Sequence, residues 1–177
     1  MVSNRNFTGY VQVYTGNGKG KTTAALGLAL RALGAGFKVF LGQFLKSGEY
    51  SEIKALKKFE PAIEVFQFGR GCFIKGKPSE EDIRLAKEGF SLCREKILSG
   101  EFNLVILDEL NLVLHFGLLE LDAVLELLKI RPKHIEIVIT GRYAPPELIQ
   151  AADLVTEMRE IKHYYQQGIL ARRGIEK

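Results

Sequence analysis

The segment "YTGNGKGKTT", residues 14–23, has the residue types of a loop that binds phosphate. Gly20, Lys21 and Thr22 match the end of the pattern G-x-x-x-x-G-K-[ST], and only the first position departs, with Thr15 in place of glycine. In such loops, backbone amides at the start of a helix hold phosphate oxygens, and the helix dipole favours negative charge there. The segment therefore predicts a nucleotide site.

The departure at Thr15 leaves the loop the conformational freedom that it needs. Gly16 and Gly18 lie inside the loop and allow several amides to turn inward. We expect the amides of residues 17–22, beginning with Asn17, to point at phosphate oxygens. The alternative is a glycine-rich connection without a ligand. A strand pattern, the loop and a helix pattern follow one another in the order that a phosphate loop requires, which favours the phosphate site.

The polar side chains of the loop have the chemistry to hold a magnesium–nucleotide complex. Lys21 would place a positive charge at the phosphates, and the Thr22 hydroxyl would be a magnesium ligand. Lys19 is a further cation, which suits a long polyphosphate. Three other basic residues are placed where they could reach phosphates, although each taken singly is more typical of a surface charge: Arg31, Lys46 and Arg142.

An acidic pair, Asp108 and Glu109, ends the apolar run "VILDE". A carboxylate at the end of a buried strand can hold magnesium directly or through water, so either residue could ligate the metal and the other could act as a base. The alternative is structural, with Asp108 capping a helix and Glu109 in its first turn. The two readings are about equal for the pair alone, and the phosphate loop favours the metal site.

Strand and helix patterns alternate along the chain, which predicts an α/β fold. Right-handed crossovers then give a P-loop NTPase-like (RecA-like) parallel sheet of about five to six strands with helices on both faces. Strands are predicted at residues 9–15, 37–44, 63–68, 103–109 and 135–140, with a possible sixth in 153–161. Helices are predicted from about residue 20, at 49–58, from Ser79 with Asp82 as a capping box, up to about 128, and at 145–152.

Polar segments follow the first, second, fourth and fifth of these strands: "TGNGKGKT", "QFLK", "DE" and "TGR". Ligands of open parallel sheets bind at the carboxyl ends of the strands, where these segments converge. The three histidines, His115, His134 and His163, have neither ligand spacing nor an obvious serine or cysteine partner. We assign them no role.

Length and composition indicate one domain over residues 1–177. The chain has 46% hydrophobic and 26% charged residues, and its net charge of +4 is mild. The basic clusters contain no aromatic residues that would stack bases, so nucleic acid is not expected as a partner. There is no signal-peptide core and no membrane span, and Cys72 and Cys93 match no zinc spacing, which together predict a cytoplasmic protein with reduced thiols.

Residue types leave the reaction open. The bound triphosphate could be attacked at phosphorus, as in a magnesium-dependent ATPase or small kinase with Glu109 as base, or at the ribose 5′ carbon. A nucleotide-dependent regulatory module without turnover is a further alternative. The choice between them needs more than the spacing of these residues.

Five segments resemble the ATP:corrinoid adenosyltransferases of the phosphate-loop (CobA/BtuR) type: "TGNGKGKTTAALGLALRALG", "VFLGQFLK", "LVILDEL", "IVITGR" and "ADLVTEMREIKH...GI.AR.GIE". The likeness runs from about Gly9 to the C-terminus. The family loop also has threonine at the position of Thr15, so this departure from the general pattern becomes a family feature.

The resemblance implies transfer of the 5′-deoxyadenosyl group of ATP to cobalt(I) of cob(I)alamin or a corrinoid precursor, with release of triphosphate. It implies a nucleotide that lies reversed relative to ordinary phosphate-loop NTPases, magnesium on Thr22 and Glu109, and Arg31 as a further nucleotide contact. Lys21, Thr22 and Glu109 would carry the catalysis. The implied triphosphate-binding residues are Thr15, Gly16, Asn17, Gly18, Lys19, Gly20, Lys21 and Thr22.

The same resemblance implies a homodimer and a flavoprotein that reduces the cobalt. Relatives often carry two aromatic residues in the segment that reads "GRGCFIKG" here, and these rings help to expel the lower cobalt ligand. This chain has Cys72 and Ile74 at those positions with Phe73 between them. Phe73 is the candidate substitute, Phe68 is a second, and loop packing is the alternative for both.

Overall fold

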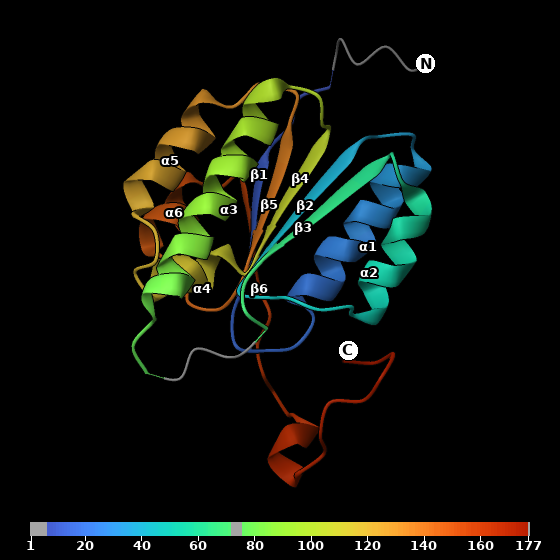
Figure 1. The fold of residues 1–177 in the computed structure, drawn as a ribbon, viewed down its shortest axis with the longest axis vertical. Coiled ribbons are helices and arrows are strands. Elements are labelled where there is room, and N and C mark those ends of the chain that lie inside the picture. Colours follow the sequence, from blue (N-terminus) through green and yellow to red (C-terminus); the bar gives the residue numbers. More distant parts are fainter. Residues whose placement is uncertain (1–6, 72–75, 177) are drawn as a thin grey trace.

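The computed structural model describes residues 7–71 and 76–176, and these residues form six strands in one sheet (Figure 1). Every strand pairing is parallel, and the order across the sheet is β3-β2-β4-β5-β1-β6. The strands are β1 (Val11–Thr15), β2 (Val39–Phe44), β3 (Ile63–Phe68), β4 (Leu104–Asp108), β5 (Glu136–Thr140) and β6 (Leu154–Glu157). All five predicted strands and the possible sixth are confirmed.

Helices cover both faces of the sheet, as predicted. Figure 1 shows α1 and α2 on one face and α3 to α6 on the other, and each group packs on its own cluster of buried apolar residues. The helices are α1 (Lys21–Gly34), α2 (Ser51–Leu56), α3 (Glu80–Ser99), α4 (Leu110–His115), α5 (Leu121–Ile130) and α6 (Pro146–Ala151), with 3-10 helices η2 (Lys57–Phe59) and η3 (Tyr164–Gln167).

The central strands are buried along their whole length because helices cover both of their faces. Every residue of β2 and β4 is buried, and both strands are rich in apolar residues. The edge strand β6 is exposed throughout. The strands β2, β4, β5 and β1 are neighbours in the parallel sheet, so their carboxyl ends lie side by side at one edge. The polar segments were predicted to converge at this edge.

Helix α3 has the cap and the apolar stripe that its sequence predicts. The Ser79 hydroxyl accepts a hydrogen bond from the Asp82 amide, and the Asp82 carboxylate accepts one from the Ser79 amide. Cys93 lies on the buried stripe with no exposed surface, and burial raises the pKa of its thiol. Cys93 is a core residue, as expected.

Two local features differ from the sequence expectation. The helix predicted at 49–58 is shorter, because α2 ends at Leu56 and continues only as the 3-10 turn η2. After β6 the chain leaves the sheet, forms η3 and returns toward the loop that follows β1 (Figure 1). This return was not predicted, since its residues have no clear periodicity.

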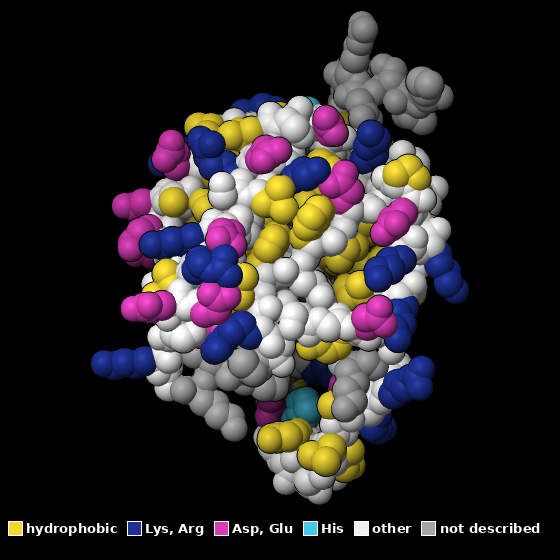
Figure 2. All heavy atoms as spheres, viewed as in Figure 1, with side chains coloured by type: hydrophobic (Ala, Val, Ile, Leu, Met, Phe, Trp, Pro, Cys, Tyr) yellow, Lys and Arg dark blue, Asp and Glu magenta, His cyan; other side chains and the backbone are white. Residues whose placement is uncertain are grey.

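The charged side chains on the surface are mixed in sign, in keeping with the small net charge of the sequence. On the face drawn in Figure 2, basic and acidic side chains are interspersed. Over the part of the chain that the structure describes, no helix has both the length and the apolar character needed to cross a membrane.

Two helical glycines predict stability changes of opposite sign. A Cβ on Gly89 of α3 would lie 2.4 Å from Cγ of Phe68, whereas a Cβ on Gly27 of α1 would meet nothing within 4 Å. Gly89→Ala should lower the free energy of unfolding by about 1–3 kcal/mol through overpacking. Gly27→Ala should raise it by about 1 kcal/mol, because alanine is the better helix former. Urea unfolding measures both, and equal signs would contradict the packing described.

Candidate functional site

The glycine loop between β1 and α1 takes its shape from the segment that follows β6. A Cβ on Gly16 or Gly18 would lie 2.5 or 2.7 Å from the carbonyl oxygen of Met158, so only glycine fits at either position. The Gly18 amide donates a 2.6 Å hydrogen bond to that same oxygen. The expectation that all amides of residues 17–22 point at phosphate is therefore wrong for Gly18, because its N–H already has a protein acceptor.

Lys21 lies inside the curve of the loop. Its Nζ donates to the carbonyl oxygens of Gly16 and Gly18, both at 2.7 Å, and only 8% of the residue is exposed. Burial lowers the pKa of Lys21, opposed by the neighbouring Glu109. The ammonium group is thus held at the mouth of the loop, where an anion would meet it.

Asp108 is a fully buried carboxylate with four side-chain donors. Its Oδ1 accepts hydrogen bonds from the hydroxyls of Thr22 (2.8 Å) and Thr140 (2.7 Å). Its Oδ2 accepts from Nε2 of Gln43 (3.0 Å) and from Nζ of Lys46 (2.7 Å). Burial lowers the pKa of Lys46, but the charge and hydrogen bond of Asp108, with the charges of Glu109 and Glu52, together outweigh it, and the pKa is raised. Lys46 is therefore part of the site and not a free surface charge.

Glu109 has a different environment from its neighbour. Its backbone is left-handed, with φ of 63°, and its amide donates to the Thr140 hydroxyl at 3.0 Å. Among the described residues, no donor reaches its enclosed Oε2. Burial and the adjacent Asp108 raise the pKa of Glu109. The alternative in which Asp108 caps a helix is wrong, because Asp108 ends β4 and Glu109 occupies the cap position of α4 without a side-chain cap bond.

These groups fit a magnesium ion. Magnesium in nucleotide sites binds one or two carboxylates, a hydroxyl, phosphate oxygens and waters. Thr22 and Glu109 both line the same cavity, and Oε2 of Glu109 has no hydrogen-bond donor among the described residues. Within residues 7–71 and 76–176, no group of three or more His, Cys, Asp or Glu side chains is arranged to hold a metal ion.

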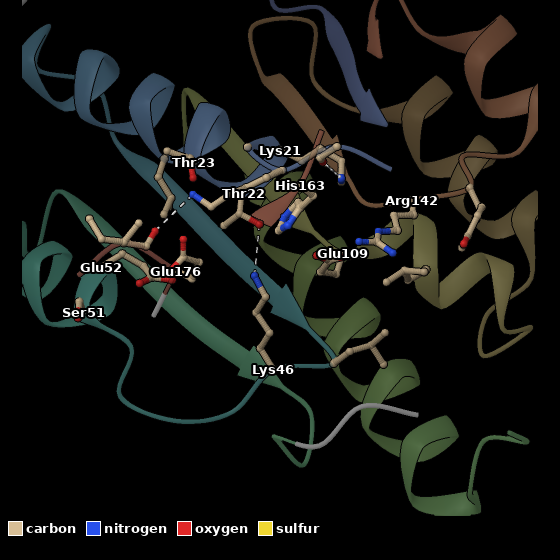
Figure 3. Close-up of a pocket in the computed structure, with 18 of the residues that line it drawn as sticks. Lys21, Thr22, Thr23, Lys46, Ser51, Glu52, Glu109, Arg142, His163 and Glu176 are labelled. Carbon is tan, nitrogen blue, oxygen red and sulfur yellow. Dashed lines mark hydrogen bonds between the residues drawn. The ribbon is translucent and has the colours of Figure 1, made fainter. Parts of the chain in front are cut away.

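A cavity of about 900 Å³ opens in front of the loop (Figure 3). Its apolar lining residues are Leu26, Leu45, Leu112, Phe116, Tyr143 and Ile175. Tyr143 has a left-handed backbone with φ of 59°, and its ring lies 4.4 Å from that of His115. The polar lining residues are Gly18, Lys19, Gly20, Lys21, Thr22, Thr23, Lys46, Ser51, Glu52, Glu109, Arg142, His163 and Glu176.

The structure brings most of the predicted site residues together. Lys21, Thr22 and Glu109 line the cavity, and Asp108 binds Thr22 directly beneath it. Arg142 and Lys46, proposed from sequence as possible phosphate contacts, are also in the lining.

Four predicted positions lie elsewhere. Thr15 is buried, and its hydroxyl accepts a hydrogen bond from the Ala144 amide, while Gly16 and Asn17 belong to the loop but not to the cavity lining. Arg31 lies in the last turn of α1, away from the lining. These residues stay predictions as nucleotide contacts. The prediction for Phe73, with Cys72 and Ile74, falls outside the described residues.

Sequence reasoning missed the C-terminal part of the cavity. His163, Gly174, Ile175 and Glu176 line it, and Nζ of Lys19 lies 3.4 Å from the Ile175 carbonyl oxygen. Nδ1 of His163 accepts a hydrogen bond from the Tyr165 amide, so the other ring nitrogen carries the proton of the neutral imidazole. The signals in the sequence were the "IKH" block and the "GI.AR.GIE" pattern of residues 168–176, which were used for the resemblance but were given no chemistry.

The parallel sheet with a glycine loop at the start of α1 defines a phosphate-loop α/β fold. The family ATP:corrinoid adenosyltransferase BtuR/CobO/CobP matches residues 7–176. The chain belongs to this family and is a transferase enzyme. It is 38% identical to the corrinoid adenosyltransferase of Pseudomonas aeruginosa, over 97% of this chain and 85% of that protein.

Two further similarities support the family and the fold. The corrinoid adenosyltransferase of Escherichia coli K12 is 34% identical, over 95% of this chain and 85% of that protein. The crystal structure of the RadB recombinase is similar with a TM-score of 0.53 at 17% identity, covering 92% of this chain and 85% of that one. The second similarity concerns the fold alone, and it confirms the P-loop NTPase-like (RecA-like) prediction.

Removal of the buried carboxylate should strongly destabilise the protein. Asp108→Ala leaves the Lys46 ammonium and three neutral donors without their acceptor, which costs about 3–5 kcal/mol in the free energy of unfolding. Asp122→Ala, at an exposed carboxylate of α5, should change it by less than about 0.5 kcal/mol. Chemical denaturation measures both. Similar values for the two variants would contradict the structural role of Asp108.

Proposed function

We propose that this protein transfers the 5′-deoxyadenosyl group of ATP to cobalt(I) of a corrinoid, within cobalamin biosynthesis or salvage, and releases triphosphate. The observation that carries the proposal is one cavity lined both by the phosphate loop with Glu109 and by the apolar residues Leu112, Phe116 and Tyr143. The polar residues suit the triphosphate, and the apolar residues suit a corrin ring. Family membership supplies the reaction class.

The polar residues of the cavity would act on the leaving group. Cobalt(I) attacks the 5′ carbon, the bond from this carbon to the phosphate oxygen breaks, and its electron pair leaves with the triphosphate. The nucleophile carries no proton, so Glu109 is needed as a ligand and not as a base. Lys21 would neutralise the departing charge and keep the triphosphate in line with the 5′ carbon.

The two neighbouring acids would divide the metal site between them. Thr22 and Glu109 would hold magnesium, which supplies charge neutralisation on the phosphates when bound. Asp108 already accepts four hydrogen bonds, so its proposed role is to orient the Thr22 hydroxyl and to anchor Lys46. Glu109 Oε2 has no such commitment to a protein donor among the described residues.

Other parts of the proposal depend on the family resemblance. They are the homodimer, the flavoprotein reductant, the cytoplasmic location, and the roles of Arg31 and Phe73. The match over residues 7–176 and the single continuous sheet support one domain over residues 1–177.

An anaerobic reaction tests the proposed chemistry. The protein, ATP, magnesium and chemically reduced cobalamin should give a light-sensitive carbon–cobalt product, seen in the visible spectrum, and one triphosphate for each adenosyl group transferred. Omission of the corrinoid should leave ATP intact. Formation of ADP and phosphate without cobalt alkylation would show instead the ATPase or kinase alternative, and ATP binding without any turnover would show a regulatory module.

Lys21 should be required for nucleotide binding. Lys21→Met removes a charge-assisted contact to phosphate, which should weaken ATP binding by about tenfold to hundredfold in calorimetry. Lys129→Met, at an exposed lysine in the last turn of α5, is the matched control and should bind ATP as the unchanged protein does. Equal ATP affinity in both variants would place the phosphates elsewhere.

A further inference from the structure

Lys46 lies between the two groups that flank the proposed metal site. Its Nζ is 2.7 Å from Oδ2 of Asp108 and 3.3 Å from Oγ1 of Thr22, the contact drawn in Figure 3. The Thr22 hydroxyl directs its proton to Asp108 Oδ1 and therefore accepts from Lys46 with a lone pair. A magnesium ligand must offer a lone pair to the metal. The ammonium occupies one of the two lone pairs of this hydroxyl oxygen, and as a second cation it competes with a metal ion for the space beside the same oxygen.

Charge adds to this competition. The Asp108 carboxylate is completely buried, and 22% of the Lys46 side chain is exposed. Two cations that share one hydroxyl and border one buried carboxylate repel each other, and in a buried site solvent screens this repulsion poorly. Metal binding at Thr22 with Lys46 in place would therefore be strongly disfavoured.

The backbone that carries Lys46 is fixed by a chain of hydrogen bonds from Asp108. Nε2 of Gln43 donates to Asp108, Nε2 of Gln67 donates to Oε1 of Gln43 at 3.0 Å, and the Gly48 amide donates to Oε1 of Gln67 at 3.1 Å. The loop that follows β2 is thereby tied to the end of β3. Displacement of the ammonium must come from the flexible side chain and not from the loop.

A close backbone contact fixes the same loop from its other side. The Leu45 amide donates to the Phe68 carbonyl oxygen at 2.9 Å, and a Cβ on Gly69 would lie 2.4 Å from the Lys46 amide nitrogen. The carboxyl ends of β2 and β3 are therefore in close backbone contact next to Lys46, and this contact fixes the Lys46 backbone. The four-carbon stem of Lys46 can still turn, because the side chain lines the cavity.

We propose that Lys46 makes divalent-metal binding depend on the nucleotide. Without a triphosphate, the Lys46 ammonium stays on Asp108 and Thr22 and excludes the metal. With a triphosphate in the cavity, the ammonium exchanges the carboxylate for a phosphate oxygen, and Thr22 becomes available to the metal. Nucleotide and metal then bind cooperatively, and each raises the affinity of the other by the same factor. This inference builds on the metal site of the proposed function.

Binding of Mn²⁺ without corrinoid tests the inference. Mn²⁺ takes the oxygen ligands of magnesium and is visible by electron paramagnetic resonance. Without nucleotide, Lys46→Met should bind Mn²⁺ at least about tenfold more tightly than the unchanged protein, because the competing charge is gone. The matched control is Lys96→Met, which removes another lysine from a 2.7 Å ion pair, with Glu64, and should leave Mn²⁺ binding unchanged.

The nucleotide dependence gives a second readout. Addition of a β,γ-imido analogue of ATP should tighten Mn²⁺ binding to the unchanged protein by at least about tenfold more than it tightens binding to Lys46→Met. An equal effect of the analogue on both proteins overturns the proposal, as does Mn²⁺ binding by Lys46→Met that is no tighter than that of the unchanged protein.

A second variant, Lys46→Gln, keeps the test valid if Lys46→Met does not fold. Lys46→Met leaves the buried Asp108 charge without its cation, whereas the neutral amide of Lys46→Gln can still donate a hydrogen bond. Lys46→Gln should show the same tighter Mn²⁺ binding and a larger rise in melting temperature on addition of Mn²⁺ than the unchanged protein; absence of both overturns the proposal. These measurements contain no corrinoid, so failure of the adenosyl-transfer assay would leave their result standing, and the reverse also holds.

Discussion

The buried carboxylate of Asp108 connects the start of α1 with β2, the loop after β2 and β5. Its donors are Thr22 on α1, Gln43 on β2, Lys46 after β2 and Thr140 on β5. A charge without exposed surface costs several kcal/mol when its partners are missing, so these four elements are held in one arrangement around β4. The start of α1, and with it the phosphate loop, therefore has a fixed position relative to the ends of the other strands.

Asp108 and Glu109 are adjacent in the sequence but have opposite relations to their surroundings. All four bonds to Asp108 come from the protein, whereas Glu109 Oε2 lacks a donor within the described residues. The left-handed backbone of Glu109 and the hydrogen bond from its amide to the Thr140 hydroxyl turn this side chain away from the strand. An acid that is already satisfied is suited to hold structure, and one that is not is suited to bind a cation. This difference decides which acid we place on the metal.

The glycines of the loop have a role that the phosphate-loop pattern does not state. Gly16 and Gly18 are packed against Met158, and the Gly18 amide is bound to that residue. The segment after β6 thus shapes the loop from outside, and farther along the chain the same segment supplies His163 and Glu176 to the cavity. The C-terminal residues and the phosphate loop therefore form one structural unit, although about 140 residues separate them.

The sequence by itself determined the strands, the helix that follows the glycine loop, the α3 capping box and the residues Lys21, Thr22, Asp108 and Glu109, because these depend on periodicity and local spacing. Only the tertiary structure decided the four donors of Asp108 and the position of Lys46. It also decided that the Gly18 amide binds the Met158 carbonyl oxygen and that C-terminal residues line the cavity. Thr22 and Asp108 are 86 residues apart, and Gln43 is 65 residues from Asp108. Such contacts arise from the order of strands in the sheet, and no local pattern encodes them.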